Sequence, residues 1–463
     1  MFLFLLAPLA VADPSPEEAS QPPVVVVAAD NEAASLSPIA RALNLRPQVE
    51  ELSNGLLVVL HENHRSPTVT LTTLVRVGSA DDPEGASGLA HLFEHLMFKG
   101  SPNAPGPEWG RLLEEAGAES KAWTERDWTL YQTSGPSSAL ERLLFLESDR
   151  LGWLAEAVKD ESVAIELDVI ANERAAREGD QSLFFSELHQ HLWPTNHPYH
   201  RPVLGLEADR DALEIGRIVK LYEAYYRPSN AILVLTGSFN REETLEQVKA
   251  HYGLIERRGS RALRAYADRP RRGSDRVIEV PGVGEPVLAM GWNTPPWGHP
   301  DLPQLRLAAE VLRARSASLP EISYRSDPQV ALRARRAGGE LVVQLVSGSD
   351  SLEDLLEQFD QELRDLALFG PTPEELSRAR MRWQARKIAD LEGLDSIGLM
   401  LARCAAVHED PNCMAPEMQA IEAISPQQVQ AAIRTHLSRD RVILKRLPGL
   451  APAPTESSEE TAP

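Results

Sequence analysis

Cysteine is nearly absent from this sequence, which contains only Cys404 and Cys413, nine positions apart. The pair allows at most one disulfide bond. That bond would close a short loop, and it would form only if the protein is exported to an oxidising compartment. Two reduced, buried thiols are an equally good interpretation of the same pair.

The sequence also lacks long apolar runs, and beyond its first residues no stretch is apolar enough to span a bilayer. Residues 2–6 form a short apolar run, which Ala10-Val11-Ala12 follows with the small-x-small pattern that signal peptidases cut. Basic residues are missing ahead of this run. We nevertheless interpret residues 1–12 as a signal peptide rather than a buried helix, and we expect an exported protein, either periplasmic or extracellular.

Basic residues are outnumbered, because 47 Lys and Arg stand against 68 Asp and Glu and give a net charge of −21. Nucleic-acid binding, which needs clustered Lys and Arg on one face, is therefore not expected. Part of the negative charge lies in two tails, residues 13–45 and 448–463. The folded body is thus less acidic than the whole chain.

The length of 463 residues and the hydrophobic content of 43% predict two domains, each with its own core. Composition places the boundaries. We predict an acidic, Pro-rich spacer at residues 13–45, an N-terminal domain at 46–256, an Arg-rich linker at 257–275, a C-terminal domain at 276–447 and an acidic tail at 448–463.

The same succession of a helix, a breaking segment and a strand is predicted in both halves of the sequence. Residues 215–226 are helical in pattern, residues 227–230 break the helix, and residues 231–235 form a short apolar strand. Near the C-terminus, residues 425–436 predict a helix and residues 442–445 a strand. We therefore predict an α+β fold of two related domains, each a mostly antiparallel β-sheet with helices packed on one face.

Residue types that bind metals lie together in His91-Leu92-Phe93-Glu94-His95. Two histidines four positions apart leave one face of a helix about one turn apart, so both imidazoles can bind one cation. Glu94 is displaced from this pair, where a carboxylate can take a proton from zinc-bound water. The order matches the inverted zincin pattern. The alternative is a surface helix with two histidines.

A catalytic zinc site needs a third protein ligand, since such sites combine three protein donors with one water. Residues 160–178 are helical in pattern and carry acidic side chains that are candidates for this role. These are Glu161, Glu166, Asp168, Glu173 and Glu178. Spacing alone does not choose among them.

Residues 82–100, with the sequence DPEGASGLAHLFEHLMFKG, resemble the motif region of the pitrilysin/insulinase family of zinc peptidases, which includes the mitochondrial processing peptidase. The resemblance covers residues 47–254 well. It implies that Glu173, in the segment ELDVIANER, is the third zinc ligand and that Glu166 is an acid supporting the site. It also implies one zinc ion per active site as the cofactor.

Ala122-Trp123-Thr124 is similar to the family strand that lines the substrate cleft, along which a peptide substrate would pair as an added strand. Where the family usually has Asn ahead of this alanine, the chain has Lys121, which affects how the peptide backbone is held. The resemblance therefore implies Lys121 and Ala122 as substrate-binding residues.

The second half departs from the family pattern. Members that act alone, or the partner subunits of other members, present an Arg and a Tyr that bind the substrate and its developing oxyanion. The equivalent residues 312–334 are shortened, with Tyr324 and Arg325 as the candidates. An intact zinc motif beside such a second half predicts a heterodimer with a homologous subunit, with a homodimer as the alternative.

These features predict a zinc-dependent endopeptidase that hydrolyses short or unfolded peptides. In this hypothesis His91, His95 and Glu173 hold zinc, while Glu94 takes a proton from the bound water and later delivers one to the leaving amine. Two alternatives stay open: a non-catalytic binding or assembly subunit of the same fold, and a structural zinc site.

Overall fold

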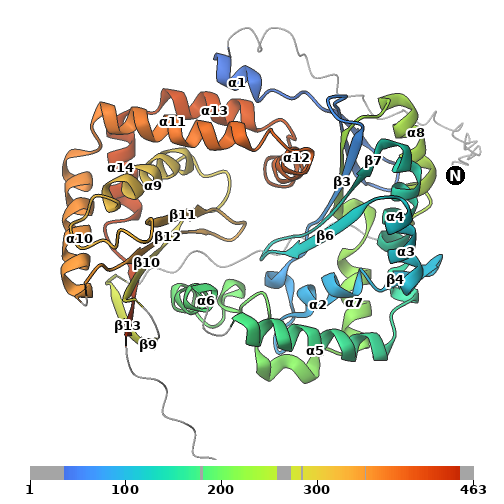
Figure 1. Cartoon of the computed structure of the whole chain (residues 1–463), viewed down its shortest axis with the longest axis horizontal. Coiled ribbons are helices and arrows are strands. Elements are labelled where there is room, and N and C mark those ends of the chain that lie inside the picture. Colours follow the sequence, from blue (N-terminus) through green and yellow to red (C-terminus); the bar gives the residue numbers. More distant parts are fainter. Residues whose placement is uncertain (1–35, 178–180, 258–272, 283–284, 350, 449–463) are drawn as a thin grey trace, which may run out of the picture. The chain divides into compact units, whose positions relative to one another are not determined.

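The computed structural model describes residues 36–177, 181–257, 273–282, 285–349 and 351–448 (Figure 1). The predicted signal peptide lies outside the described residues, as do most of the predicted spacer, linker and acidic tail. Within the described ranges, no helix is both long and apolar enough to cross a membrane.

Two mixed sheets of mostly antiparallel strands form the framework, so the α+β prediction is confirmed (Figure 1). The first sheet has the order β1-β2-β8-β3-β7-β6 and the second the order β11-β12-β10-β13-β9. The strands of the first sheet are β1 (Gln48–Glu51), β2 (Leu57–Glu62), β3 (Thr68–Val75), β6 (Glu119–Thr124), β7 (Thr129–Pro136) and β8 (Ala231–Gly237). Those of the second are β9 (Arg276–Gly282), β10 (Val287–Thr294), β11 (Gln329–Arg333), β12 (Gly339–Val346) and β13 (Arg441–Pro448). A small hairpin pairs β4 (Gly100–Ser101) with β5 (Ala104–Pro105).

The two sheets share one topology. In the first, β2 and β8 pair in parallel, and antiparallel pairs then join β8 to β3, β3 to β7 and β7 to β6. In the second, β9 and β13 pair in parallel, and antiparallel pairs join β13 to β10, β10 to β12 and β12 to β11. Strand β1 is an addition to the first sheet. The prediction of two related halves is thereby confirmed.

Helices cover the sheets on both sides. The helices before the second sheet are α1 (Pro38–Ala42), α2 (Leu89–Leu96), α3 (Pro107–Glu115), α4 (Leu140–Trp153), α5 (Asp160–Arg177), α6 (Gln181–Leu192), α7 (Ile215–Tyr225) and α8 (Arg241–Tyr252). Those between β10 and β13 along the chain are α9 (Leu302–Ser316), α10 (Leu352–Phe369), α11 (Pro373–Ala389), α12 (Leu394–His408), α13 (Met414–Ala423) and α14 (Pro426–His436). As predicted, a helix, α14, follows Ser425 and ends at His436, and Ser425 is its N-cap in a capping box.

One helix from each half packs on the sheet of the other half. Helix α12 packs on β3 and β8, where its Leu401 joins Leu74 and Ile232 in one apolar cluster. Helix α6 packs in the same way on β10 and β13. The approach of α12 is close, since a Cβ at Gly398 would lie 2.5 Å from Thr72 Oγ1. A face of the sheet that one half leaves bare is therefore buried by the other half.

The two cysteines are bonded to each other in the structure. Cys404 lies in α12 and Cys413 directly before α13, and their disulfide closes the turn between these helices. Of the two interpretations that the sequence allowed, the structure has the disulfide.

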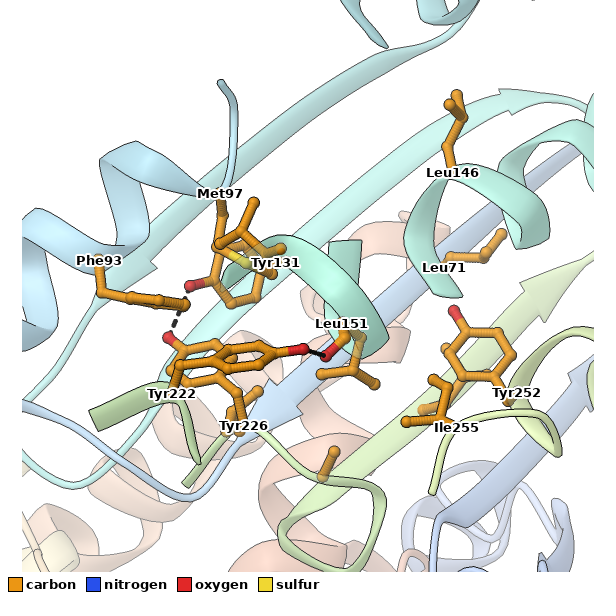
Figure 2. Close-up of a cluster of buried hydrophobic side chains, with 14 of the residues drawn as sticks. Leu71, Phe93, Met97, Tyr131, Leu146, Leu151, Tyr222, Tyr226, Tyr252 and Ile255 are labelled. Carbon is orange, nitrogen blue, oxygen red and sulfur yellow. Dashed lines mark hydrogen bonds between the residues drawn. The ribbon is translucent and has the colours of Figure 1, made fainter. Parts of the chain in front are cut away.

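An aromatic cluster sets the rotation of α2 (Figure 2). Phe93 is fully buried, with its ring 4.1 Å from that of Tyr226 and 5.9 Å from that of Tyr222. His91 and His95 each lie two positions from Phe93, which is about 200° around an α-helix. Burial of Phe93 therefore turns both histidines away from this cluster and toward α5, on which α2 packs.

Candidate metal centre

The loop before α2 fixes where the helix begins. The Asp82 carboxylate accepts hydrogen bonds from the backbone N–H groups of Gly88, at 2.7 Å, and of Ala90, at 2.8 Å. Burial raises the pKa of Asp82 to about 7, although both N–H groups favour its ionised form. Gly88 has a left-handed backbone (φ 92°), and a Cβ there would lie 3.0 Å from the Leu204 carbonyl oxygen. Glycine is therefore required at this turn.

His91, His95 and Glu173 converge between α2 and α5. Glu173 Oε2 lies 3.8 Å from His91 Nε2, and Glu173 Oε1 lies 3.6 Å from His95 Nε2. Zinc bonds of about 2.0–2.2 Å place neighbouring tetrahedral ligands about 3.3–3.6 Å apart. The donor types and spacings therefore fit a zinc ion held by these three side chains. The Glu173 side chain is 33% exposed, so the cluster remains accessible from solvent.

A buried acid holds one of the histidines in place. Glu166, whose side chain is 4% exposed, lies with Oε2 2.9 Å from His95 Nδ1 and with Oε1 2.5 Å from Lys99 Nζ. A proton on Nδ1 then donates to Glu166, which leaves the lone pair of Nε2 facing Glu173. Sequence reasoning gave Lys99 no role, although the residue lies inside the segment that carries the resemblance.

Glu94, next to His95 on α2, reaches the edge strand β6. Thr124 Oγ1 donates a hydrogen bond of 2.6 Å to Glu94 Oε2. Burial raises the pKa of Glu94 above its usual value, while the bond from Thr124 opposes this shift. Thr124 Oγ1 is itself 3.5 Å from Thr129 Oγ1, which donates to the backbone carbonyl of Val77 at 2.9 Å. The Glu94 carboxylate is thus tied to β6 by both the hydroxyl and the backbone of Thr124.

The two predicted substrate-binding residues of β6 lie on opposite faces of the sheet. Ala122 pairs with Tyr131 and packs against the core on the α2 side. Lys121 lies on the α12 side, where its Nζ is 2.6 Å from Asp395 Oδ2. Sequence reasoning did not anticipate this partner, because Lys121 and Asp395 are 274 positions apart.

Tyr324 and Arg325 are not part of the cluster. The Tyr324 side chain is 91% exposed, and Arg325 Nε lies 3.4 Å from its hydroxyl. Arg325 also lies 3.8 Å from Glu285. Among the described contacts, neither residue touches His91, His95 or Glu173.

Two family models match this chain in consecutive segments. The model described as Insulinase (Peptidase family M16) matches residues 57–205, and the one described as Peptidase M16 inactive domain matches residues 212–382.

Curated relatives agree with the models. The zinc protease PqqE of Helicobacter pylori is 26% identical over 368 residues, which cover 76% of this chain and 81% of PqqE. Bovine cytochrome b-c1 complex subunit 1 is 26% identical over 301 residues, covering 64% of this chain and 62% of that protein. The probable mitochondrial-processing peptidase subunit beta of Schizosaccharomyces pombe is 25% identical over 275 residues, covering 55% and 56%.

Solved structures share the fold. A protease from Helicobacter pylori superposes with a TM-score of 0.78 at 22% identity, covering 87% of this chain and 100% of the other. The periplasmic protease PqqL from Escherichia coli superposes with a TM-score of 0.74 at 18% identity. That match covers 88% of this chain but 49% of PqqL.

Proposed function

The chain belongs to the M16 insulinase/pitrilysin family of peptidases, and we propose that it is a zinc-dependent endopeptidase that hydrolyses short or unfolded peptides. One observation carries the proposal: His91, His95 and Glu173 converge from two helices beside Glu94, at the edge strand of the first sheet. A purely structural zinc site would not need an additional carboxylate held beside it.

In this proposal His91, His95 and Glu173 hold the zinc ion, and Glu166 orients His95. Zinc, when bound, polarises the scissile carbonyl and lowers the pKa of a bound water toward neutrality. Glu94, held by Thr124, accepts a proton from the attacking water and later returns a proton to the leaving amine. Burial raises the pKa of Glu94 above its usual value, which makes the carboxylate a better proton acceptor.

The proposed substrate path follows β6. This strand is the last one of its sheet beyond β7, so an extended peptide can pair with its outer edge. Ala122 and Thr124 then line the path on the side of Glu94. Lys121, bound to Asp395 on the other face, ties the edge strand to α12 rather than reaching toward the metal ligands.

We propose that a homologous subunit completes the site with an Arg and a Tyr, in a heterodimer or a homodimer. Tyr324 and Arg325 lie outside the metal cluster, which leaves this role open for a partner. The PqqL match supports an assembly of two homologous units, because the PqqL chain is about twice the matched length and has room for a second unit of this fold. Two of the relatives are also named as subunits of larger assemblies, which agrees with a partner subunit for this chain.

The domain boundaries and the location of the protein are also proposals. We propose that residues 46–256 form the zinc-carrying domain and residues 276–447 its companion, joined by the linker 257–275. We further propose export after removal of residues 1–12. The bonded pair Cys404 and Cys413 is consistent with an oxidising compartment.

The proposed activity is tested with a pool of internally quenched peptides, with and without a homologous M16 subunit. We expect cleavage that a chelator abolishes and added zinc restores, with the higher rate in the presence of the partner. If the zinc-loaded chain, alone and with its partner, leaves the whole pool uncut, the alternative of a non-catalytic subunit takes the place of this proposal.

Thr124 provides a graded test of how Glu94 is positioned. Thr124→Val removes the hydroxyl but keeps the shape, and we expect kcat to fall about tenfold, as for a lost hydrogen bond to a charged group, with KM little changed. Thr124→Ser keeps the hydroxyl and should restore most of the rate. Equal rates for the Val and Ser variants would show that the hydroxyl has no role.

A further inference from the structure

A second group of metal-binding side chains lies in the C-terminal half, between the start of α9 and the end of α14. It consists of His299, Asp301 and His436, each of which offers one donor atom within 4.8 Å of the others. His436 Nε2 lies 2.7 Å from Asp301 Oδ2, and His299 Nδ1 lies 4.0 Å from the same oxygen. The His436 side chain is 6% exposed, whereas those of His299 and Asp301 are 36% exposed.

The backbone around the first two residues is tightly fixed. The Leu302 N–H donates to the carbonyl of His299 at 3.1 Å, and the Asp301 N–H donates to His299 Nδ1 at 3.1 Å. His299 Nδ1 is therefore an acceptor for the Asp301 backbone, and a metal ion bound through this nitrogen would replace that hydrogen bond. These bonds hold two donors side by side before any ligand binds.

The Asp301 carboxylate does not cap the helix that Asp301 precedes. Asp301 is the N-cap residue of α9, where an aspartate normally accepts a hydrogen bond from a backbone N–H of the first helical turn. Here no such side-chain bond is made. The carboxylate is turned instead toward the two imidazoles. Helix capping therefore does not explain its orientation.

The third donor comes from the end of another helix. His436 is the last residue of α14, and α14 packs on α9. The carbonyl end of a helix carries partial negative charge, which favours a cation near it. His299 also lines a cavity of about 920 Å³, from which water can complete the coordination of an ion. A simple ion pair of Asp301 and His436 does not involve His299, whose Nδ1 accepts the Asp301 N–H.

We propose that His299, Asp301 and His436 form a second divalent-metal site of the zinc class, structural in role, which links the start of α9 to the end of α14. Two imidazoles and one carboxylate suit zinc, and they also accept cobalt(II) as a spectroscopic substitute. The donor atoms must move by about 1–2 Å to reach spacings typical of bound zinc. The site is independent of the proposed peptidase activity.

The test uses the full chain carrying His95→Ala, which disables the first cluster, so that only the second one is measured. We expect it to bind about one zinc ion per chain after dialysis, to show the visible absorption of a cobalt(II) complex, and to gain thermal stability with added zinc. Adding His299→Gln, which keeps the pair of Asp301 and His436, should abolish all three signals. His408→Gln, which removes an exposed histidine from the same cavity, should abolish none.

Two results would overturn the proposal. One is a His95→Ala chain that binds neither zinc nor cobalt(II). The other is equal binding in the His95→Ala chain with and without His299→Gln, because the ion pair of Asp301 and His436 alone would then account for the geometry. The cobalt(II) spectrum decides the matter even if His299→Gln changes stability for another reason.

Discussion

Glu94→Gln is expected to lower kcat/KM for peptide hydrolysis by about 10²–10⁴-fold, the range lost with a general acid–base group, while the chain keeps its zinc. Glutamine preserves the size of the side chain and can still accept the hydrogen bond from Thr124, but it cannot take a proton from water at neutral pH. Glu94 is displaced from the three donors, so metal content should not change. The measurements are rates on a cleaved peptide and zinc content by elemental analysis.

A matched control separates this effect from a general loss of acidic charge. Glu161→Gln changes an exposed carboxylate at the start of α5, and it should leave both rate and zinc content unchanged. A Glu94→Gln chain that cleaves peptides at the original rate would exclude Glu94 as the base. A chain that loses its zinc would instead show that Glu94 is a ligand.

The histidine pair could be predicted from sequence because its geometry is local. Four positions on a helix bring His91 and His95 to one face whatever the rest of the chain does. The direction in which this face points could not be predicted, because it depends on burial of Phe93 against Tyr222 and Tyr226, more than a hundred positions away.

The third ligand shows the limit of spacing arguments. Glu166 and Glu173 lie two turns apart on α5, and both reach the cluster, yet one faces His95 Nδ1 and the other faces the Nε2 atoms. Which acid takes which place depends on how α5 lies across α2, which is a tertiary contact. The family resemblance therefore supplied an assignment that helix geometry left open, and that assignment is still to be tested.

Long-range contacts explain what the sequence did not predict. The order of helix, breaker and strand correctly indicated two related halves, because it is repeated locally. The exchange of α6 and α12 between the sheets, and the meeting of His299 with His436, depend on segments far apart in the chain. Local patterns carry no information about such pairings.

Glu173→Ala is expected to abolish zinc binding at this site and, with it, peptide hydrolysis. Zinc in a catalytic site is held by three protein donors, and two imidazoles alone bind it far more weakly. Glu166→Ala should act differently, because Glu166 contacts His95 Nδ1, whereas Glu173 faces His95 Nε2. We expect it to weaken zinc affinity by about 10–100-fold and to leave residual activity at saturating zinc.

Zinc titration of the two variants, followed by peptidase assays at saturating metal, distinguishes a ligand from a supporting acid. The second metal site proposed above would add to the total zinc, so the titrations are best done in chains that also carry His299→Gln. If Glu173→Ala keeps its affinity and Glu166→Ala loses it, the roles are reversed and Glu166 is the ligand. Such an exchange would still leave His91 and His95 as the core of the site, since either acid on α5 reaches His95.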